Sequence, residues 1–276
     1  MQETVLTFVD VAKSYGDVRA LHSLSVAVQR DEIVALLGPN GAGKTTALEI
    51  ALGLRAADGG RVRLFGGSPQ SAATRRRLGA TPQETGFPDM LRVEEIAAFV
   101  AEHYPSHAPI GATLERFGLA ELAKRRAQTL SGGESRRLAL ALAFIGDPEF
   151  VVLDEPTTGL DVESRRRLWE VVRNLGSRRS ILFTTHYLEE AEALATRILV
   201  LDRGQLLFDG APRTLRGLIG GRRLSYVGAD GPVSVTTQDA DAYIRAMVNG
   251  AVVFSDLEIV RPSLEEAFLT LTGGSQ

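Results

Sequence analysis

The sequence predicts an α/β fold with a largely parallel sheet, an antiparallel β subdomain, an inserted helical subdomain and a small C-terminal α+β appendix. Two observations carry this prediction. Short, continuously apolar segments, which are typical of buried strands, alternate with segments of helical periodicity. After about residue 217 the pattern changes to shorter alternating segments around a helix. We therefore expect a main domain over residues 1–217 and an accessory domain over residues 218–276.

The main domain begins with two alternating, β-branched segments, TVLTFVDVA and LHSLSVAVQ, and each predicts a strand. Continuous apolar segments then predict four buried strands, namely EIVALLG, FVVLDEP, SILFTTH and RILVLDRG. GKTTALEIALGL and residues 188–195 have helical spacing. Residues from about 88 to 146 are helical in pattern, so we expect a helical subdomain inserted between the first two buried strands.

The accessory domain shows a different texture. RRLSYVG, VSVTT and AVVFSDLEIV predict strands around the helix QDADAYIRAMV. The final segment, SLEEAFLTLTG, carries Ser263 and Glu266 at the spacing of a capping box and ends on glycine. We therefore expect it to close the domain as a short helix.

Composition excludes several classes of function. The formal net charge of −3 argues against sequence-independent binding of nucleic acid, so no nucleic-acid partner is expected. The absence of cysteine excludes disulfides and cysteine-based zinc sites. No segment approaches the roughly 18 apolar residues of a membrane helix, and the N-terminus lacks the pattern of a signal peptide. A membrane role would therefore need a separate partner chain.

The segment GPNGAGKTT, residues 38–46, matches the phosphate-loop pattern G-x-x-x-x-G-K-[ST]. Glycines let backbone N–H groups converge on phosphate oxygens at the start of a helix. Lys44 is suited to the β- and γ-phosphates of ATP, and the Thr45 hydroxyl to Mg²⁺. A chance match is the alternative, but a predicted strand before the loop and a helix after it favour a P-loop NTPase core. The predicted nucleotide-binding residues here are Gly38, Asn40, Gly41, Gly43, Lys44, Thr45 and Thr46.

Asp154 and Glu155 follow the buried strand FVVLDEP. Carboxylates at the carboxyl end of such a strand lie at the sheet edge where ligands bind. We expect Asp154 to hold Mg²⁺ and Glu155 to act as general base toward the attacking water. The alternative is a pair of solvated acids in a turn before Pro156.

Motifs in a fixed order from about Thr4 to Gly217 resemble the nucleotide-binding subunit of an ABC transporter. They are KSYGDVRAL, the Walker A loop GPNGAGKTT, the Q-loop segment TPQETGFPDM, the signature LSGGE, the Walker B strand FVVLDEP, the D-loop GLD at 159–161 and the switch segment FTTH. Seven such segments in order are far more specific than a phosphate loop alone, which unrelated NTPases share.

The resemblance implies roles for three further side chains. Tyr15 would stack on adenine, although it could also be an exposed aromatic in a turn. Gln83 would lie near Mg²⁺ and the attacking water, as a metal ligand and catalytic residue, or else be a surface polar residue. His186 would hydrogen-bond the γ-phosphate and orient Glu155, whereas an isolated histidine after a strand is usually structural.

The signature residues Ser131, Gly132, Gly133 and Glu134 allow two interpretations. Ser131 and Glu134 fit a helix capping box, which leaves the two glycines unexplained. The resemblance implies instead that this segment binds the ATP held by a second subunit, although Glu134 stands where the family usually has glutamine. Asp161 would contact the dimer partner, or only cap the helix that follows it.

The resemblance as a whole implies an ATPase that uses ATP and Mg²⁺. Two such subunits, in a homodimer or heterodimer, would close head to tail on separate transmembrane permease subunits at the cytoplasmic face of the plasma membrane. The ending SLEEAFLTLTG is similar to that of bacterial ATPase subunits, of the daunorubicin-resistance type, that serve exporters of drugs, antibiotics or lipids. The alternatives are the ATPase of an importer, or a soluble ABC ATPase of translation or DNA repair.

Overall fold

The computed structural model describes residues 3–81, 86–176 and 178–273, and the chain divides into two compact units. The first is Met1–Asp209 and the second is Gly210–Gln276. The sequence analysis placed this division after residue 217. The structure instead assigns helix α8 (Pro212–Gly217) to the second unit, where it packs against α10 (Leu264–Leu271).

The first unit is built around a six-stranded sheet in the order β5-β6-β7-β3-β8-β9. The strands are β3 (Ile33–Leu37), β5 (Leu78–Thr81), β6 (Phe150–Asp154), β7 (Ser180–Thr184), β8 (Arg197–Asp202) and β9 (Gln205–Gly210). The pairs from β5 through β8 are all parallel. Every residue of β3, β6 and β7 is buried, as expected for strands covered on both faces. The predicted parallel α/β core is confirmed.

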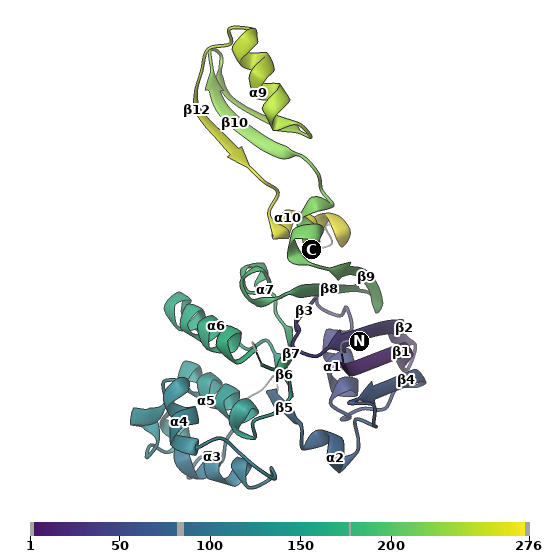
Figure 1. The fold of residues 1–276 in the computed structure, drawn as a ribbon, viewed down its shortest axis with the longest axis vertical. Coiled ribbons are helices and arrows are strands. Elements are labelled where there is room, and N and C mark those ends of the chain that lie inside the picture. Colours follow the sequence, from purple (N-terminus) through teal and green to yellow (C-terminus); the bar gives the residue numbers. More distant parts are fainter. Residues whose placement is uncertain (1–2, 82–85, 177, 274–276) are drawn as a thin grey trace. The chain divides into compact units, whose positions relative to one another are not determined.

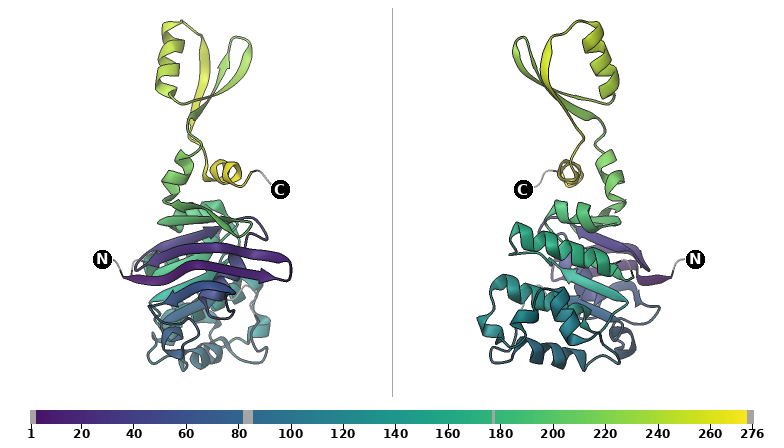
Figure 2. Two further views of the ribbon diagram at one scale, coloured as in Figure 1. Left: turned by 90° about the vertical axis from the view of Figure 1, so that its right-hand side faces the viewer. Right: turned by 60° about the vertical axis from the view of Figure 1, so that its left-hand side comes forward.

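A second, antiparallel sheet has the order β2-β1-β4, with β1 (Thr4–Tyr15), β2 (Val18–Gln29) and β4 (Gly59–Leu64). Strands β1 and β2 lie side by side as the long purple ribbons of Figure 2. Both run further than predicted, because register shifts interrupt the strict alternation of apolar residues. Apolar side chains of this sheet, of β3 and of α1 (Lys44–Ala51) form one core. That core fixes the start of α1 against two sheets.

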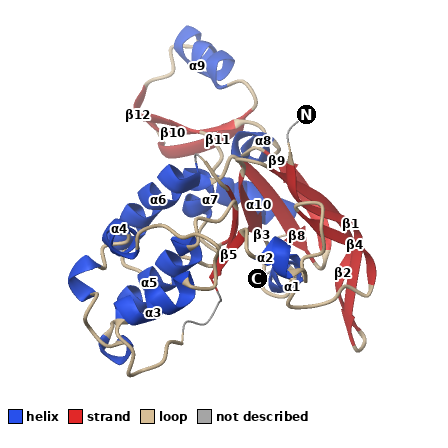
Figure 3. Cartoon of the chain, turned by 60° about the horizontal axis from the view of Figure 1, so that its bottom comes forward, coloured by secondary structure: helices blue, strands red, loops and turns tan. Residues whose placement is uncertain are grey.

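Helices of the first unit other than α1 and α2 gather on the side of the central sheet opposite the antiparallel sheet (Figures 1 and 3). They are α3 (Val93–Ala101), α4 (Ile110–Arg116), α5 (Gly132–Ile145), α6 (Val162–Gly176) and α7 (Leu188–Leu194), while the short α2 (Ala72–Arg75) precedes β5. Helices α3, α4 and α5 pack on one another, as predicted for an inserted helical subdomain. Among the described residues, none of the helices combines the length and apolar character needed to span a bilayer.

The second unit contains a three-stranded antiparallel sheet, β11-β10-β12, with helix α9 beside it (Figure 2). Its elements are β10 (Arg222–Gly228), β11 (Gly231–Thr237), α9 (Ala240–Asn249) and β12 (Phe254–Val260), flanked by α8 and α10. The predicted capping box starts α10: the Glu266 N–H donates to Ser263 Oγ (3.1 Å), and the Ser263 N–H donates to Glu266 Oε2 (2.9 Å). The predicted α+β appendix is therefore present.

Gly79 sets how closely β5 approaches α5. A Cβ at this position would lie 1.9 Å from the carbonyl oxygen of Ala143. We expect Gly79→Ala to lower the free energy of unfolding by about 1–3 kcal/mol, because the helix must move away from the strand. Gly111 in α4 is the matched control: a Cβ there meets nothing within 4 Å, so Gly111→Ala should leave stability equal or higher. Urea unfolding of both variants checks this, and equal midpoints would contradict it.

Candidate functional site

The phosphate loop leaves the end of β3 and enters α1, and its glycines are required by close packing. A Cβ on Gly38 would lie 2.3 Å from the carbonyl oxygen of Leu201, and one on Gly43 would lie 2.4 Å from that of Ala20. Gly43 also takes a left-handed conformation, with φ of 99°, at the start of α1. This conformation favours glycine and leaves the N-terminus of the helix open to an anion.

Lys44 is held inside the loop. Its Nζ donates to the carbonyl oxygens of Gly38 (2.6 Å) and Pro39 (2.9 Å). Burial lowers the pKa of Lys44, while the negative charges of Glu155 and Asp154 act in the opposite direction. The loop carbonyls therefore fix the ammonium group in the pocket that Asp154 and Glu155 also line.

A pocket of about 320 Å³ joins the phosphate loop to the carboxylates. It is lined by Tyr15, Val18, Arg19, Ala20, Asn40, Gly41, Ala42, Gly43, Lys44, Thr45, Thr46, Asp154 and Glu155. The Tyr15 side chain is 40% exposed, its hydroxyl lies 3.5 Å from Thr46 Oγ1, and the Arg55 guanidinium lies 5.1 Å from its ring centroid. The structure thus brings most of the predicted nucleotide-binding residues into one pocket, and adenine stacking on Tyr15 stays a prediction.

Asp154 ends β6 and is almost fully buried. Burial raises its pKa, and the hydroxyl of Thr184, which donates to Asp154 Oδ1, opposes this shift. The backbone N–H of Asp154 donates to Thr81 Oγ1 (3.2 Å) on the neighbouring strand β5. Asp154 is therefore held from both strands that flank β6, its carboxylate by Thr184 and its backbone by Thr81.

Glu155 takes a left-handed backbone conformation, with φ of 46°, which is uncommon outside glycine. Its N–H donates to Thr184 Oγ1 (3.0 Å), and its Oε2 accepts a hydrogen bond from Thr158 Oγ1 (3.1 Å). His186, two residues beyond β7, places Nδ1 3.5 Å from the same Oε2. The structure therefore brings the predicted base and the predicted switch histidine together.

Arg136 was missed in the sequence and lies at the centre of the arrangement. From α5, it donates from Nε to the carbonyl oxygen of Pro156 (3.2 Å) and from Nη2 to the carbonyl oxygens of Asp154 and Glu155. The residue is 5% exposed, and burial lowers its pKa. The signal in the sequence that could have revealed it was an arginine within an otherwise apolar helical segment. It ties the helix that follows the signature to the loop that carries the carboxylates.

The signature forms the capping box that the sequence allows. Ser131 Oγ accepts from the Glu134 N–H (3.2 Å), and Glu134 Oε2 accepts from the Ser131 N–H (2.7 Å), which lowers the pKa of Glu134. Gly132 faces open space, because a Cβ there would meet nothing within 4 Å, and Gly133 lies against Leu160. None of these four residues is among the described residues that line the nucleotide pocket.

Two further predictions have different outcomes. Asp161 Oδ1 accepts a hydrogen bond from the backbone N–H of Ser164 (2.9 Å), so its carboxylate caps the start of α6, and a contact with a second subunit stays a prediction. Gln83 lies outside the described residues.

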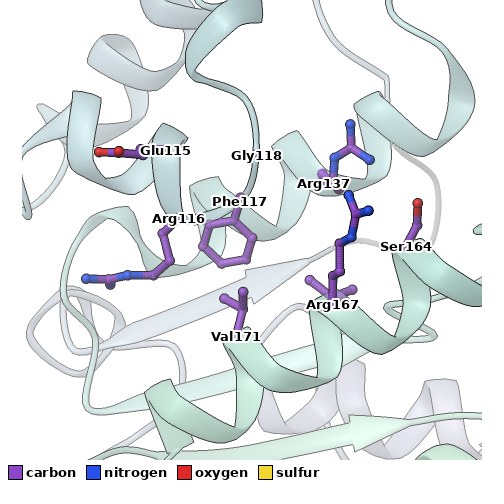
Figure 4. Close-up of a pocket in the computed structure, with 9 residues that line it drawn as sticks. Glu115, Arg116, Phe117, Gly118, Arg137, Ser164, Arg167 and Val171 are labelled. Carbon is purple, nitrogen blue, oxygen red and sulfur yellow. The ribbon is translucent and has the colours of Figure 1, made fainter.

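A second pocket, of about 240 Å³, lies between α4, α5 and α6 (Figure 4). It shares no lining residue with the nucleotide pocket. Its lining comprises Glu115, Arg116, Phe117, Gly118, Arg137, Ser164, Arg167, Leu168 and Val171. None of the predicted site residues is among them. Arg167 is 74% exposed and pairs with Glu163 on its own helix. We therefore assign no ligand to this pocket.

Comparison with known sequences agrees with the geometry. The family model for the ABC transporter matches residues 21–158. The daunorubicin resistance ATP-binding protein DrrA3 of Streptomyces coeruleorubidus is 34% identical, over 99% of this chain and 97% of that protein. The Nod factor export ATP-binding protein I of Paraburkholderia xenovorans (strain LB400) is 38% identical, over 99% and 98%.

Solved structures agree as well. An ATP-binding subunit of an ABC transporter superposes with a TM-score of 0.71 at 25% identity, over 78% of this chain and 93% of that chain. A dimeric ATP-binding cassette in a post-hydrolysis state with ADP and Pi shares the fold, with a TM-score of 0.68 at 22% identity, over 75% and 98%. The chain carries the phosphate loop and the adjacent carboxylates, and it matches the daunorubicin resistance and Nod factor export relatives over almost their whole length. This chain therefore belongs to the ABC transporter family as an ATP-binding ATPase subunit.

Proposed function

We propose that this chain hydrolyses ATP at two sites shared between two subunits, and that it thereby drives export of a drug, antibiotic or lipid through separate permease subunits. The observation that carries the proposal is the single pocket that unites Lys44 with Asp154 and Glu155. The exporter class is supported by relatives named for daunorubicin resistance and Nod factor export, whose similarity extends through the C-terminal unit.

Each group in the pocket has a role that follows from its chemistry. Backbone N–H groups of the loop and the Lys44 ammonium bind the phosphates of ATP. Thr45 and Asp154 supply the hard oxygen donors that Mg²⁺ prefers, and both line the same pocket, so the residues present fit this ion. Mg²⁺ would neutralise charge on the phosphates, with Gln83 as a further ligand. Tyr15 would stack on adenine.

Glu155 is the general base in this proposal. Its carboxylate accepts a proton from the attacking water, and His186 orients Glu155 and hydrogen-bonds the γ-phosphate. The backbone of Glu155 is fixed through Thr184 and Arg136 before ATP arrives. Such preorganisation keeps the base from relaxing away from the phosphate.

The signature serves the ATP of the second subunit. Ser131, Gly132 and Gly133 start a helix of 14 residues, where backbone N–H groups favour an anion, yet they lie outside the chain's own nucleotide pocket. In a head-to-tail dimer, this helix start would face the partner's phosphates. Asp161, at the start of α6, would contribute to the same interface.

A permease would dock on a mostly apolar hollow beside α2 and α3. This hollow of about 480 Å³ is lined by Ala72, Arg75, Arg76, Phe99, Val100, His103 and Tyr104. Phe99 is 62% exposed, and aromatic side chains are enriched in the interfaces between proteins. A short permease segment would occupy the hollow, and the permease would hold the chain at the cytoplasmic face of the plasma membrane.

The proposal is tested by purifying the chain together with the membrane permease that copurifies with it. In lipid vesicles, drugs or lipids that are exported should raise ATP turnover several-fold, and Lys44→Ala should abolish both basal and stimulated turnover. The variant Lys124→Ala, which removes an exposed lysine of the helical subdomain that does not line the pocket, is the matched control. Stimulation only by a substrate-loaded binding protein would indicate an importer instead.

A further inference from the structure

Glu190, on α7, is a fully buried carboxylate outside the nucleotide pocket, with 0% of its surface exposed. Carboxylates are almost never buried to this degree unless they are paired. Burial raises the pKa of Glu190, and hydrogen bonds from three side chains act in the opposite direction. The structure therefore keeps a costly group at this position and surrounds it with donors.

The three donors come from three separate segments. Thr157 Oγ1, in the loop after β6, donates to Glu190 Oε2 (3.1 Å). Trp169 Nε1, on α6, donates to Oε1 (3.1 Å). The hydroxyl of Thr185, in the loop after β7, also donates to this carboxylate. Glu190 thus joins the two loops that leave β6 and β7 to one helix.

Both of these loops carry groups proposed for hydrolysis. Thr157 follows Glu155 by two residues, and Thr185 directly precedes His186. Thr157 and Thr185 are themselves buried, at 1% and 2% exposed. Thr185 Oγ1 also accepts a hydrogen bond from the Tyr187 N–H (2.9 Å), so its hydroxyl fixes the backbone on the far side of His186 as well.

We propose that Glu190 is a positioning residue for ATP hydrolysis, which sets Glu155 relative to His186 by anchoring Thr157 and Thr185. The inference rests on the proposed role of Glu155 as general base. Glu190 does not touch the nucleotide pocket in the described residues, so it acts through the two loops. A buried carboxylate suits this task because both of its oxygens accept hydrogen bonds. The amide of glutamine has the same size but only one oxygen, so its NH₂ group would face one of the donors.

Three variants of the full chain test the proposal. Glu190→Gln keeps the volume but loses acceptor capacity, and Thr157→Val removes one donor. Both should lower kcat about 10-fold or more, with KM for ATP and nucleotide affinity within about twofold of wild type, because misplaced groups slow the chemistry without changing the phosphate loop. Trp169→Phe is the matched control: it removes a donor to the same carboxylate from a helix that carries neither reacting group, and it should keep kcat within about twofold.

Coupling between the variants separates positioning from general stability. Glu190→Gln combined with Thr157→Val should lower kcat no further than Glu190→Gln alone, because the bond from Thr157 is one of those that Glu190→Gln already disturbs. Thermal unfolding of each variant is measured in parallel, and Thr157→Val provides the test if Glu190→Gln does not fold. The proposal is overturned if the single variants lower the melting temperature while kcat stays at the wild-type value, or if their effects on kcat multiply.

Failure of the proposed function is recognised separately with Glu155→Gln. If that variant abolishes turnover while Glu190→Gln and Thr157→Val do not, only the positioning role is wrong. If Glu155→Gln retains wild-type turnover, the general base itself is misassigned and the positioning role fails with it.

Discussion

Replacing Glu155 with glutamine should lower the kcat for ATP hydrolysis by about 10²–10⁴-fold while leaving ATP binding intact, because a neutral amide of the same shape cannot accept the proton of the attacking water. The phosphate loop and Lys44 are unchanged by this variant, so the affinity for ATP should stay close to that of wild type. With hydrolysis blocked, the ATP-bound dimer should accumulate and be detected by size-exclusion chromatography with light scattering.

A second glutamate controls for the loss of charge in the Glu155 experiment. Glu163, at the start of α6, has a side chain that is 76% exposed and pairs with Arg167 on the same helix. Glu163→Gln should retain wild-type turnover, since exposed ion pairs contribute little. Unchanged turnover in Glu155→Gln would show that another group activates the water.

Replacing Ser131 with arginine should lower turnover by about 10²-fold or more, although ATP still binds. The arginine side chain would fill the open space in front of Gly132, where a partner's phosphates are expected. The hydroxyl of Ser131 also caps α5, and loss of this cap alone should cost about 1 kcal/mol of stability. Steady-state turnover, nucleotide affinity and thermal unfolding together separate the two effects.

The chain offers a matched control for Ser131→Arg in its own C-terminal unit. Ser263 and Glu266 form the same capping box at the start of α10. Ser263→Arg should therefore bring a similar loss of a helix cap but normal turnover. If both serine variants lose turnover equally, the signature is acting only as a helix cap.

Local patterns predicted the site best where a few neighbouring residues dictate the backbone. Gly38 and Gly43 are needed because other backbone atoms lie within 3 Å of a Cβ there, and the spacing of the loop alone reveals them. Asp154 follows from its place at the end of a buried strand. The sequence thus predicted that the phosphate loop and the carboxylates lie together, as the pocket shows. Their roles in hydrolysis stay predictions.

Contacts between distant segments could not be predicted in the same way. Arg136 reaches carbonyl oxygens some 20 residues along the chain, and Glu190 collects donors from three segments, so neither role has a local signature. The strand limits differ for a related reason. Register shifts in β1 allow pairing to continue past the point where its alternating pattern breaks. Tertiary pairing, rather than local pattern, decides these features.

The shared ATP site is tested most directly by mixing two inactive variants, Lys44→Ala and Ser131→Arg. In a head-to-tail dimer, a mixed pair has one site with both defects and one with neither. The account therefore predicts that mixing restores up to about a quarter of wild-type turnover, whereas a chain carrying both changes restores none with either single variant. If the signature served the nucleotide of its own chain, every site in the mixture would carry a defect. Turnover that stays at the level of the separate variants would contradict the account.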